Sequence, residues 1–406
     1  MSRFPSLAAL AAVCLLIAPL TAHAGATDAN ATPTDAAVTP SAAAWRQQLP
    51  AESRSLMDRL GARLEAAYDE KHGYVDKNRL PSESSIEIAL MNGRGESDSY
   101  WNAHARQSVD WMVTLFDTTM GGFFHGAEDS DVKSAAYAKR TDSNARRFEA
   151  VMLAWEATGD PRLKRLMRKE AEYFQRVLAE GRAGFVWGQV GDRQLYPEPN
   201  GLAIRSWLHY ATLNADPRAR DYALKSLDAV FEQSWMGFGA FWRQSFLQDL
   251  EKGARASDQA VMGRAYIYAA RVAGREDDRT RAEAIGDLLL QRFIDAEDGH
   301  FNTTVAPKKD GSTRGSGRES LDNALVVRFL AELTHLTGEE KYRDAARGTV
   351  RAFAEDFDKM KLDAADWALA VRALSVNDLP SAPEWKSVVQ NVPSTQSRSK
   401  TYRAGK

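Results

Sequence analysis

The stretch DSNARRFEAVMLAWEATGDPR, residues 142–162, decides the fold, because three other segments of the chain repeat its layout. In each segment an Asn or Gln is followed by a small residue and by apolar residues at three- and four-residue intervals, which is typical of an α-helix. A turn such as Thr-Gly-Asp begins fourteen positions after that anchor. The four anchors, which lie 56, 59 and 64 residues apart, are Asn144, Asn200, Gln259 and Asn323.

A second helix with charge on one face follows each turn, as in LKRLMRKEAEYFQRVL at residues 163–178. The first helix of each pair is apolar on more of its circumference, so we expect it to be buried on several sides. Weaker copies of the inner helix at residues 84–91 and 367–376 complete a set of six inner and six outer helices. We therefore predict an all-α fold, a closed (α/α)6 toroid of six helical hairpins, with an open solenoid as the competitor.

The two ends of the chain differ in composition from this repeat. Arg3 is followed by the apolar run LAALAAVCLLIAPL and then by small residues at Ala22 and Ala24, as in a secretory signal peptide. The run is too short to span a membrane. The predicted segments are a signal peptide (1–24), a flexible Ala/Thr/Pro linker (25–48), the toroid domain (49–379) and a disordered polar tail (380–406).

These ends predict a periplasmic or secreted protein, without membrane insertion after signal cleavage. The only cysteine, Cys14, lies in the signal, which excludes disulfides and thiol chemistry in the mature protein. The net charge of -2 argues against nucleic acid as the main partner. The sequence contains no HExxH, GxSxG or GxxxxGK[ST] motif, and we expect no metal and no cofactor.

Five loops that each carry a Gly followed by an aromatic residue precede inner helices. Gly suits a position with positive φ, and the aromatic ring can pin the loop onto the barrel. We expect these loops to lie on one face of the ring, at the N-terminal ends of the inner helices, around the mouth of a central cavity. The loops are KHGYVD (71–76), GGFFHG (121–126), RAGFVWGQ (182–189), GFGAFW (237–242) and DGHFNTT (298–304).

The polar residues of these loops and helix starts suit a carbohydrate ligand, since carboxylates catalyse glycoside hydrolysis and indole rings stack on sugars. For hydrolysis, the best-placed pair is Asp142 and Asp322, because both begin well-matched inner helices. For a sugar epimerase, His125 and His300 hold comparable positions on two non-adjacent loops and are the candidate bases. The expected substrate-binding residues are Asp129, Asn144, Trp187, Gln189, Glu198, Trp242, Asp258 and Asn323.

Several of these segments resemble a known family. They are YDEKHGYV, FDTTMGGFFHGAEDSD, DSNARRFEAVMLAWEATGD, and the stretch that begins at DGHFNTT and ends at LTGEEKYRDAA. Over residues 50–375 the chain resembles the helical domain of the thioredoxin-domain proteins related to spermatogenesis-associated protein 20. The resemblance implies a six-hairpin glycosidase-like domain akin to the N-acylglucosamine 2-epimerase and cellobiose epimerase fold, with no settled reaction.

The chain also departs from that family. The thioredoxin domain and its cysteines are missing, and the family's PHFEKMLYDNA is AYAKRTDSNA here, so only Lys139, Asp142, Asn144 and Ala145 fit. The lost His and Glu favour a non-catalytic toroid that binds a glycan or a protein partner. The retained acids and tryptophans favour a secreted hydrolase or epimerase with a carbohydrate or small-molecule ligand in the cavity. Each acid has a further explanation as a helix cap.

Overall fold

The computed structural model describes residues 47–380 except 48, 95, 97–98, 128–134, 137, 190–192, 237–238 and 243–252. All of these residues belong to one structural unit, residues 40–406. The predicted signal peptide, nearly all of the predicted linker, Asp129 and the tail beyond Pro380 lie outside the described residues. Within the described ranges, no helix is both long and apolar enough to cross a membrane.

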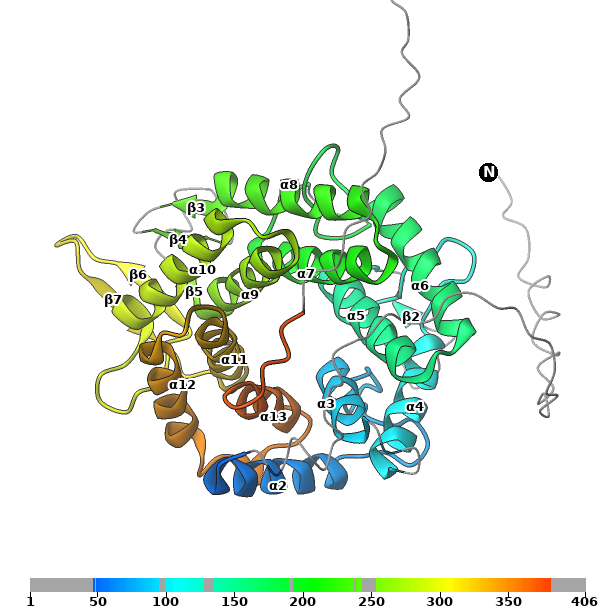
Figure 1. Cartoon of the computed structure of the whole chain (residues 1–406), viewed down its shortest axis with the longest axis horizontal. Coiled ribbons are helices and arrows are strands. Elements are labelled where there is room, and N and C mark those ends of the chain that lie inside the picture. The colour runs from blue at the N-terminus through cyan, green and yellow to red at the C-terminus, as the bar shows by residue number, and fades with distance from the viewer. Residues whose placement is uncertain are drawn as a thin grey trace, which may run out of the picture. The chain divides into compact units, whose positions relative to one another are not determined.

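Twelve α-helices in the described part of the chain form two concentric layers (Figure 1). The inner layer consists of α3 (Glu83–Gly93), α5 (Thr141–Thr158), α7 (Pro197–Asn214), α9 (Ala256–Ala273), α11 (Ser320–Thr337) and α13 (Ala364–Ala373). The outer layer consists of α2 (Ala51–Ala66), α4 (Tyr100–Val113), α6 (Pro161–Tyr173), α8 (Pro217–Ser234), α10 (Glu276–Leu288) and α12 (Glu340–Phe353). Each inner helix packs against the next, and α13 packs against α3 and α2, which closes the ring. The prediction of an all-α, six-hairpin toroid is confirmed.

Shorter elements decorate the connections. The π-helical turns η2 (Phe174–Leu178) and η4 (Leu289–Phe293) extend α6 and α10, and the 3-10 turn η5 (Phe357–Lys359) follows α12. The antiparallel strand pairs are β1 (Gly126–Ala127) with β2 (Ala135–Ala136), and β3 (Trp235–Met236) with β4 (Ala240–Phe241). A three-stranded antiparallel sheet of β5 (Ala254–Arg255), β6 (Thr304–Pro307) and β7 (Thr313–Ser316) joins the loops before α9 and α11.

The turn between α5 and α6 shows why the sequence reverses direction there. Gly159 ends α5 in the left-handed conformation with φ 65, and its N–H donates to the Trp155 carbonyl. The Asp160 side chain then accepts from the Arg162 N–H, and Pro161 occupies the first turn of α6. A left-handed Gly, an Asp cap and an N-terminal Pro each favour a helix boundary at this position.

The repeated Asn or Gln anchor fixes the loop that precedes its helix. In α11, the Asn323 Oδ1 accepts from the Phe301 N–H at 2.7 Å, and Nδ2 donates to the Phe301 and Glu319 carbonyls at 2.9 Å each. The same three bonds are made by Asn144, Asn200 and Gln259 to Phe123, Phe185 and Phe241 and to the carbonyls four residues before each anchor. All four anchors are 0% exposed.

This amide clamp corrects two expected substrate contacts. Asn144 and Asn323 were expected to bind substrate, but their amides are buried and bonded to the protein backbone. A buried amide whose hydrogen bonds are all made to the backbone is not available to a ligand. The two residues are therefore structural, and they position the mouth loops.

After α13 the chain runs along the C-terminal ends of the inner helices. Arg372 pairs with Asp378 at 2.8 Å, and the Arg271 Nε at the end of α9 donates to the Pro380 carbonyl at 3.2 Å. Val376 and Leu379 pack against the hydrophobic core on the way. The described chain thus ends on the face opposite the loops.

Candidate functional site at the mouth of the ring

The starts of the inner helices are linked to one another by side chains. The links are Ser84–Asp366 (2.6 Å), Trp367–Ser320 (2.9 Å), Arg255–Asp322 (3.4 Å), Arg146–Glu198 (3.8 Å) and Arg147–Glu83 (3.0 Å). Between α7 and α9, Gly201 lies directly against Val261, where a Cβ would meet a Val261 methyl at 2.8 Å. The six helix starts therefore share one face of the ring, as the sequence predicts. We call this face, with its Gly–aromatic loops, the mouth.

Asp142 is held by a cation at the start of α5. The Arg140 Nε donates to its Oδ1 at 3.1 Å, and the Arg140 Nη2 contacts its Oδ2. The Ser143 N–H donates to the same carboxylate at 2.7 Å. The Arg140 guanidinium also lies over the Trp187 ring at 4.7 Å. The contacts of Asp142 with Arg140 and with the Ser143 N–H suit a role in positioning Arg140 against Trp187.

Asp322 at the start of α11 has a different environment. It is 4% exposed, and its cationic partner is the Arg255 Nη2 at 3.4 Å. Burial raises the pKa of Asp322, and the negative charges of Glu198 and Glu319 raise it further against the opposing charge of Arg255. A carboxyl group whose pKa is raised by burial and by other carboxylates is a candidate for an acid catalyst.

Asp366 at the start of α13 is a further acidic residue of the mouth. Its Oδ1 accepts from the Ser84 hydroxyl at 2.6 Å, which links the starts of α13 and α3. Burial raises the pKa of Asp366, and the Ser84 hydrogen bond and the Arg146 charge partly oppose the rise. Asp258, Asp322 and Asp366 all begin inner helices, and this equivalence was visible in the sequence.

The two predicted catalytic histidines occupy different settings. His125 Nδ1 lies 2.8 Å from the Ser143 Oγ, and its Nε2 lies 3.4 Å from the Arg140 Nη1. Burial and the neighbouring Arg140 charge lower the pKa of His125, so the imidazole is neutral at neutral pH and able to accept a proton.

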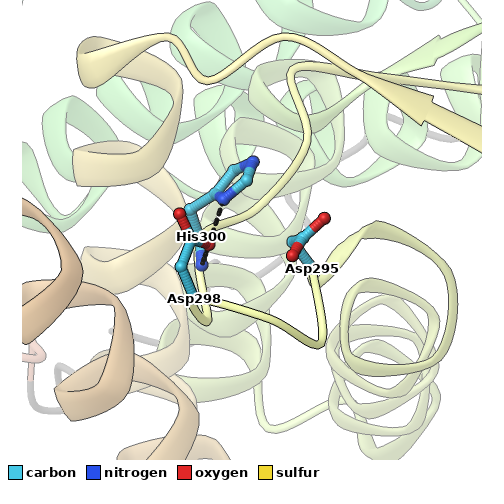
Figure 2. A group of neighbouring side chains, drawn as sticks. All are labelled: Asp295, Asp298 and His300. Atoms are coloured by element: carbon cyan, nitrogen blue, oxygen red, sulfur yellow. Dashed lines mark hydrogen bonds and ion pairs between the residues drawn. The ribbon is translucent and has the colours of Figure 1, made fainter.

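His300 belongs to a tight turn after η4 (Figure 2). Its Nδ1 contacts the Asp298 carboxylate, and its carbonyl accepts from the Asp295 N–H at 2.7 Å. His125 and His300 are therefore held by separate local contacts in front of α5 and α11. Their action as a pair stays a prediction.

Asp295, Asp298 and His300 are also a group of described residues whose ligand atoms converge, within 4.8 Å of one another. The turn itself accounts for this arrangement. The Asp295 Oδ1 accepts from the Glu297 N–H at 2.9 Å, and the Arg318 Nε lies 3.6 Å from the Asp298 Oδ2. The three residues could hold a cation with oxygen and imidazole ligands, but a guanidinium already occupies one side.

Trp187 and Trp242, both expected to stack on a sugar, differ in exposure. Trp187 is half-buried, with Arg140 over its ring and the Tyr196 ring at 5.4 Å. Trp242 is 2% exposed, and its Nε1 donates to the Met236 carbonyl at 3.0 Å. The expectation for Trp242 is wrong because its ring is part of the core. Trp187 remains partly accessible, with Arg140 over its ring, and its stacking on a sugar stays a prediction.

The remaining expected substrate contacts also divide into accessible and buried side chains. Glu198 is half-buried beside Arg146, and Gln189 is exposed with its N–H bonded to the Lys139 carbonyl at 3.0 Å. Asp258 is 0% exposed, so the expectation that it contacts a bound sugar is corrected: it lies behind the mouth surface.

A second set of charged residues lies deeper along the axis of the ring. Arg328 pairs with Glu87 across α13, Arg264 pairs with Glu332 at 2.8 Å, and His209 lies 3.1 Å from both Glu149 and Glu156. The sequence carried a signal for these residues that the prediction missed. Five positions after the four anchors stand Glu149, Arg205, Arg264 and Arg328, a charge at the same place in each of the four anchored helices.

A groove of about 670 Å³ lies elsewhere, between the C-terminal ends of α3 and α5 and the helices α4 and α6. Its carboxylates Asp110 and Asp160 are ion-paired with the exposed Arg162, at 3.4 and 2.8 Å. The chemistry of the mouth, with buried acids of raised pKa, is absent from the residues that line this groove. We therefore place the candidate site at the mouth.

Comparison with known proteins shows the fold. No family model matches the sequence, and the search of curated proteins gives no match. A D-mannose isomerase structure is similar with a TM-score of 0.67 and 10% identity, over 80% of this chain and 98% of that chain. Cellobiose 2-epimerase from Spirochaeta thermophila gives 0.59 and 12%, over 80% and 96%. A glycoside hydrolase family 76 mannosidase from Bacteroides thetaiotaomicron gives 0.58 and 13%, over 79% and 97%. The chain thus shares the toroid of these sugar isomerases, epimerases and hydrolases.

Proposed function

We propose that this chain is a carbohydrate-active enzyme that hydrolyses a glycosidic bond at the mouth of the toroid. The observation that carries the proposal is Asp322, a buried carboxyl group whose pKa is raised by burial and by the nearby charge of Glu198. Two carboxyl groups whose environments separate their protonation states are what glycoside hydrolysis requires. The shared fold with sugar-active enzymes is consistent with this reaction but does not select it.

In this proposal Asp322 donates its proton to the oxygen of the leaving group. Glu198, on α7, serves as the second carboxylate and either attacks the anomeric carbon or activates water. Trp187 supplies an indole face for a sugar ring, and its position is fixed by Arg140 and Tyr196. Asp142, which was expected to act with Asp322, instead holds Arg140 against Trp187.

Sugar epimerisation is the second candidate, because His125 is a neutral imidazole at the mouth. An epimerase needs a base on each face of the carbon that loses its proton, and His300 would have to leave its contact with Asp298 to serve. A toroid that binds a glycan or a protein partner without turnover is the remaining alternative.

The test is a screen of the mature protein against neutral and acidic oligosaccharides. Three quantities are measured: the shift in melting temperature, the release of reducing ends and the formation of epimers. Hydrolysis predicts that Asp322→Asn and Glu198→Gln lower turnover by about 10²–10⁴-fold while the ligand still shifts the melting temperature. The matched control is Asp110→Asn, an exposed carboxylate on the outer helix α4 that pairs with Arg162.

Other outcomes separate the alternatives. Epimer formation that His125→Ala abolishes and Asp322→Asn spares would replace the hydrolase with an epimerase. Ligand binding without any turnover would leave a glycan-binding toroid.

We also propose the following context for the enzyme. Residues 1–24 direct export to the periplasm or medium, and the folded domain extends over residues 49–379. The chain is related to the helical domain of the thioredoxin-domain proteins named above, through the Asn144 clamp and the loop 121–126. Fractionation of cells that express the full chain, with blotting for a shortened product, tests the export.

A further inference from the structure

Arg146 has an unusual place among the arginines of the mouth. It projects from α5, yet its charge acts on Glu198 of α7 at 3.8 Å and on Asp366 of α13, which lies on the other side of α3. The Arg146 side chain thus crosses from the start of α5 to the start of α7, among the acids of the mouth. Its side chain is 26% exposed.

The hydrogen-bonding capacity of Arg146 is largely unused. Within the described part of the chain its nearest partner oxygen is the Glu198 Oε1 at 3.8 Å, which is beyond hydrogen-bond distance. Its sequence neighbour Arg147 shows the contrast, because that guanidinium donates to Glu83 and to the carbonyls of Phe124 and His125. An arginine has five N–H donors in a planar fork, and Arg146 leaves that fork available.

Arg255 repeats this situation on the other side of Glu198. Its Nη2 lies 3.4 Å from the Asp322 Oδ2, its side chain is 36% exposed, and its buried Nε has no hydrogen-bond partner within the described residues. Two guanidinium groups with spare donors therefore flank the carboxyl groups of the proposed reaction.

The acids between these arginines can accommodate another negative charge. Burial raises the pKa of both Asp322 and Asp366, so each takes up a proton more readily than a free carboxyl group. Asp142 and Glu83 are neutralised by their own arginine partners. The cations that remain suited to a ligand are Arg146 and Arg255.

We propose that the mouth selects an acidic sugar, and that Arg146, assisted by Arg255, binds the carboxylate of a uronic acid residue. A planar guanidinium and a carboxylate match each other with two parallel hydrogen bonds, which a neutral hydroxymethyl group does not provide. The proposal names the substrate class of the proposed hydrolase and rests on that function.

The test uses matched pairs of sugars that differ only at the sixth carbon: glucuronate and glucose, galacturonate and galactose, mannuronate and mannose, as monomers and short oligomers. Binding is measured by calorimetry at low ionic strength with the wild type, Arg146→Gln, Arg146→Lys and Arg255→Gln. We expect at least one uronate to bind about tenfold or more tightly than the neutral sugar of the same pair. Arg146→Gln should remove that preference and Arg146→Lys should restore part of it.

The matched control is Arg162→Gln, an exposed arginine at the start of α6 with 65% side-chain exposure, which should leave the preference unchanged. Circular dichroism of each variant checks that the fold is retained, and Arg255→Gln provides a second reading if Arg146→Gln does not fold. Neutral sugars that bind as tightly as their uronates would overturn this inference and leave the hydrolase intact. Failure of every sugar to bind would overturn both.

Discussion

The substitution Asn323→Ala tests the amide clamp that fixes the mouth loops. The Asn323 side chain makes three hydrogen bonds of 2.7, 2.9 and 2.9 Å to the Phe301 N–H, the Phe301 carbonyl and the Glu319 carbonyl. Asn323 and Phe301 are both 0% exposed, so water does not replace the lost bonds. Each buried backbone group left without a partner costs about 1–3 kcal/mol, and two such groups of Phe301 are affected. We expect the free energy of unfolding to fall by about 3–5 kcal/mol.

The measurement is urea unfolding followed by far-ultraviolet circular dichroism, with the slope compared between variants. The control Asn214→Ala removes one amide bond of 2.9 Å to the Tyr210 carbonyl on an exposed helix end. It should change the free energy of unfolding by less than about 0.5 kcal/mol. A loss below about 1 kcal/mol for Asn323→Ala would refute the clamp. If that variant does not fold, hydrogen exchange of the Phe301 amide in Asn323→Gln gives the answer, because Gln259 performs the same role in α9.

Further predictions concern three buried side chains, His209, Glu170 and Trp242, and the half-buried Trp187 at the mouth. Burial lowers the pKa of His209, but the charge of Glu149 outweighs this and the pKa is raised to about 10. Because this pKa lies above the usual 6.5, protonated His209 stabilises the fold fully below about pH 6.5, and this stabilisation is lost as the pH rises through 10. In His209→Gln the free energy of unfolding in urea should therefore depend less on pH between pH 7 and 10. Burial raises the pKa of Glu170 from 4.5 to about 8, so the stability falls as the pH rises through this interval, and Glu170→Gln should be more stable than the wild type at pH 8. Trp242→Ala should lower the free energy of unfolding by about 3–5 kcal/mol, whereas Trp187→Ala should weaken sugar binding and leave unfolding by urea nearly unchanged.

The architecture was accessible from the sequence because the repeat ties helix, turn and loop together at fixed offsets. The anchor spacing predicted the inner helices, and the Gly–aromatic loops predicted which face carries them. The role of the anchors was not predicted. A polar residue at the start of an apolar helix looks the same in sequence whether it meets a ligand or the backbone of a neighbouring loop. Only burial, 0% exposure for Asn144 and Asn323, separates the two cases.

The site was harder to predict than the fold because function depends on partners across the ring. Asp142 and Asp322 occupy similar positions in the repeat, but Asp142 pairs with Arg140, whereas burial and the charge of Glu198 raise the pKa of Asp322. These partners come from different hairpins, and one sequence does not show which charges meet. The interior charge five residues after each anchor was visible, yet an arginine on an apolar helix is usually read as a solvent-facing residue.

The closure of the ring has a consequence for the time course of folding. The inner helices α3 to α11 meet partners that are close in the chain, but α2 packs against α13, and its Arg59 binds Asp358, 299 residues away. Contacts of such long sequence separation form late and slowly. During synthesis, α2 therefore keeps an uncovered apolar face until α13 has been made. We expect chains that stop before Ala364 to be digested rapidly by proteases. We expect the packing of α13 against α2 to set the rate at which the full chain becomes resistant to proteases.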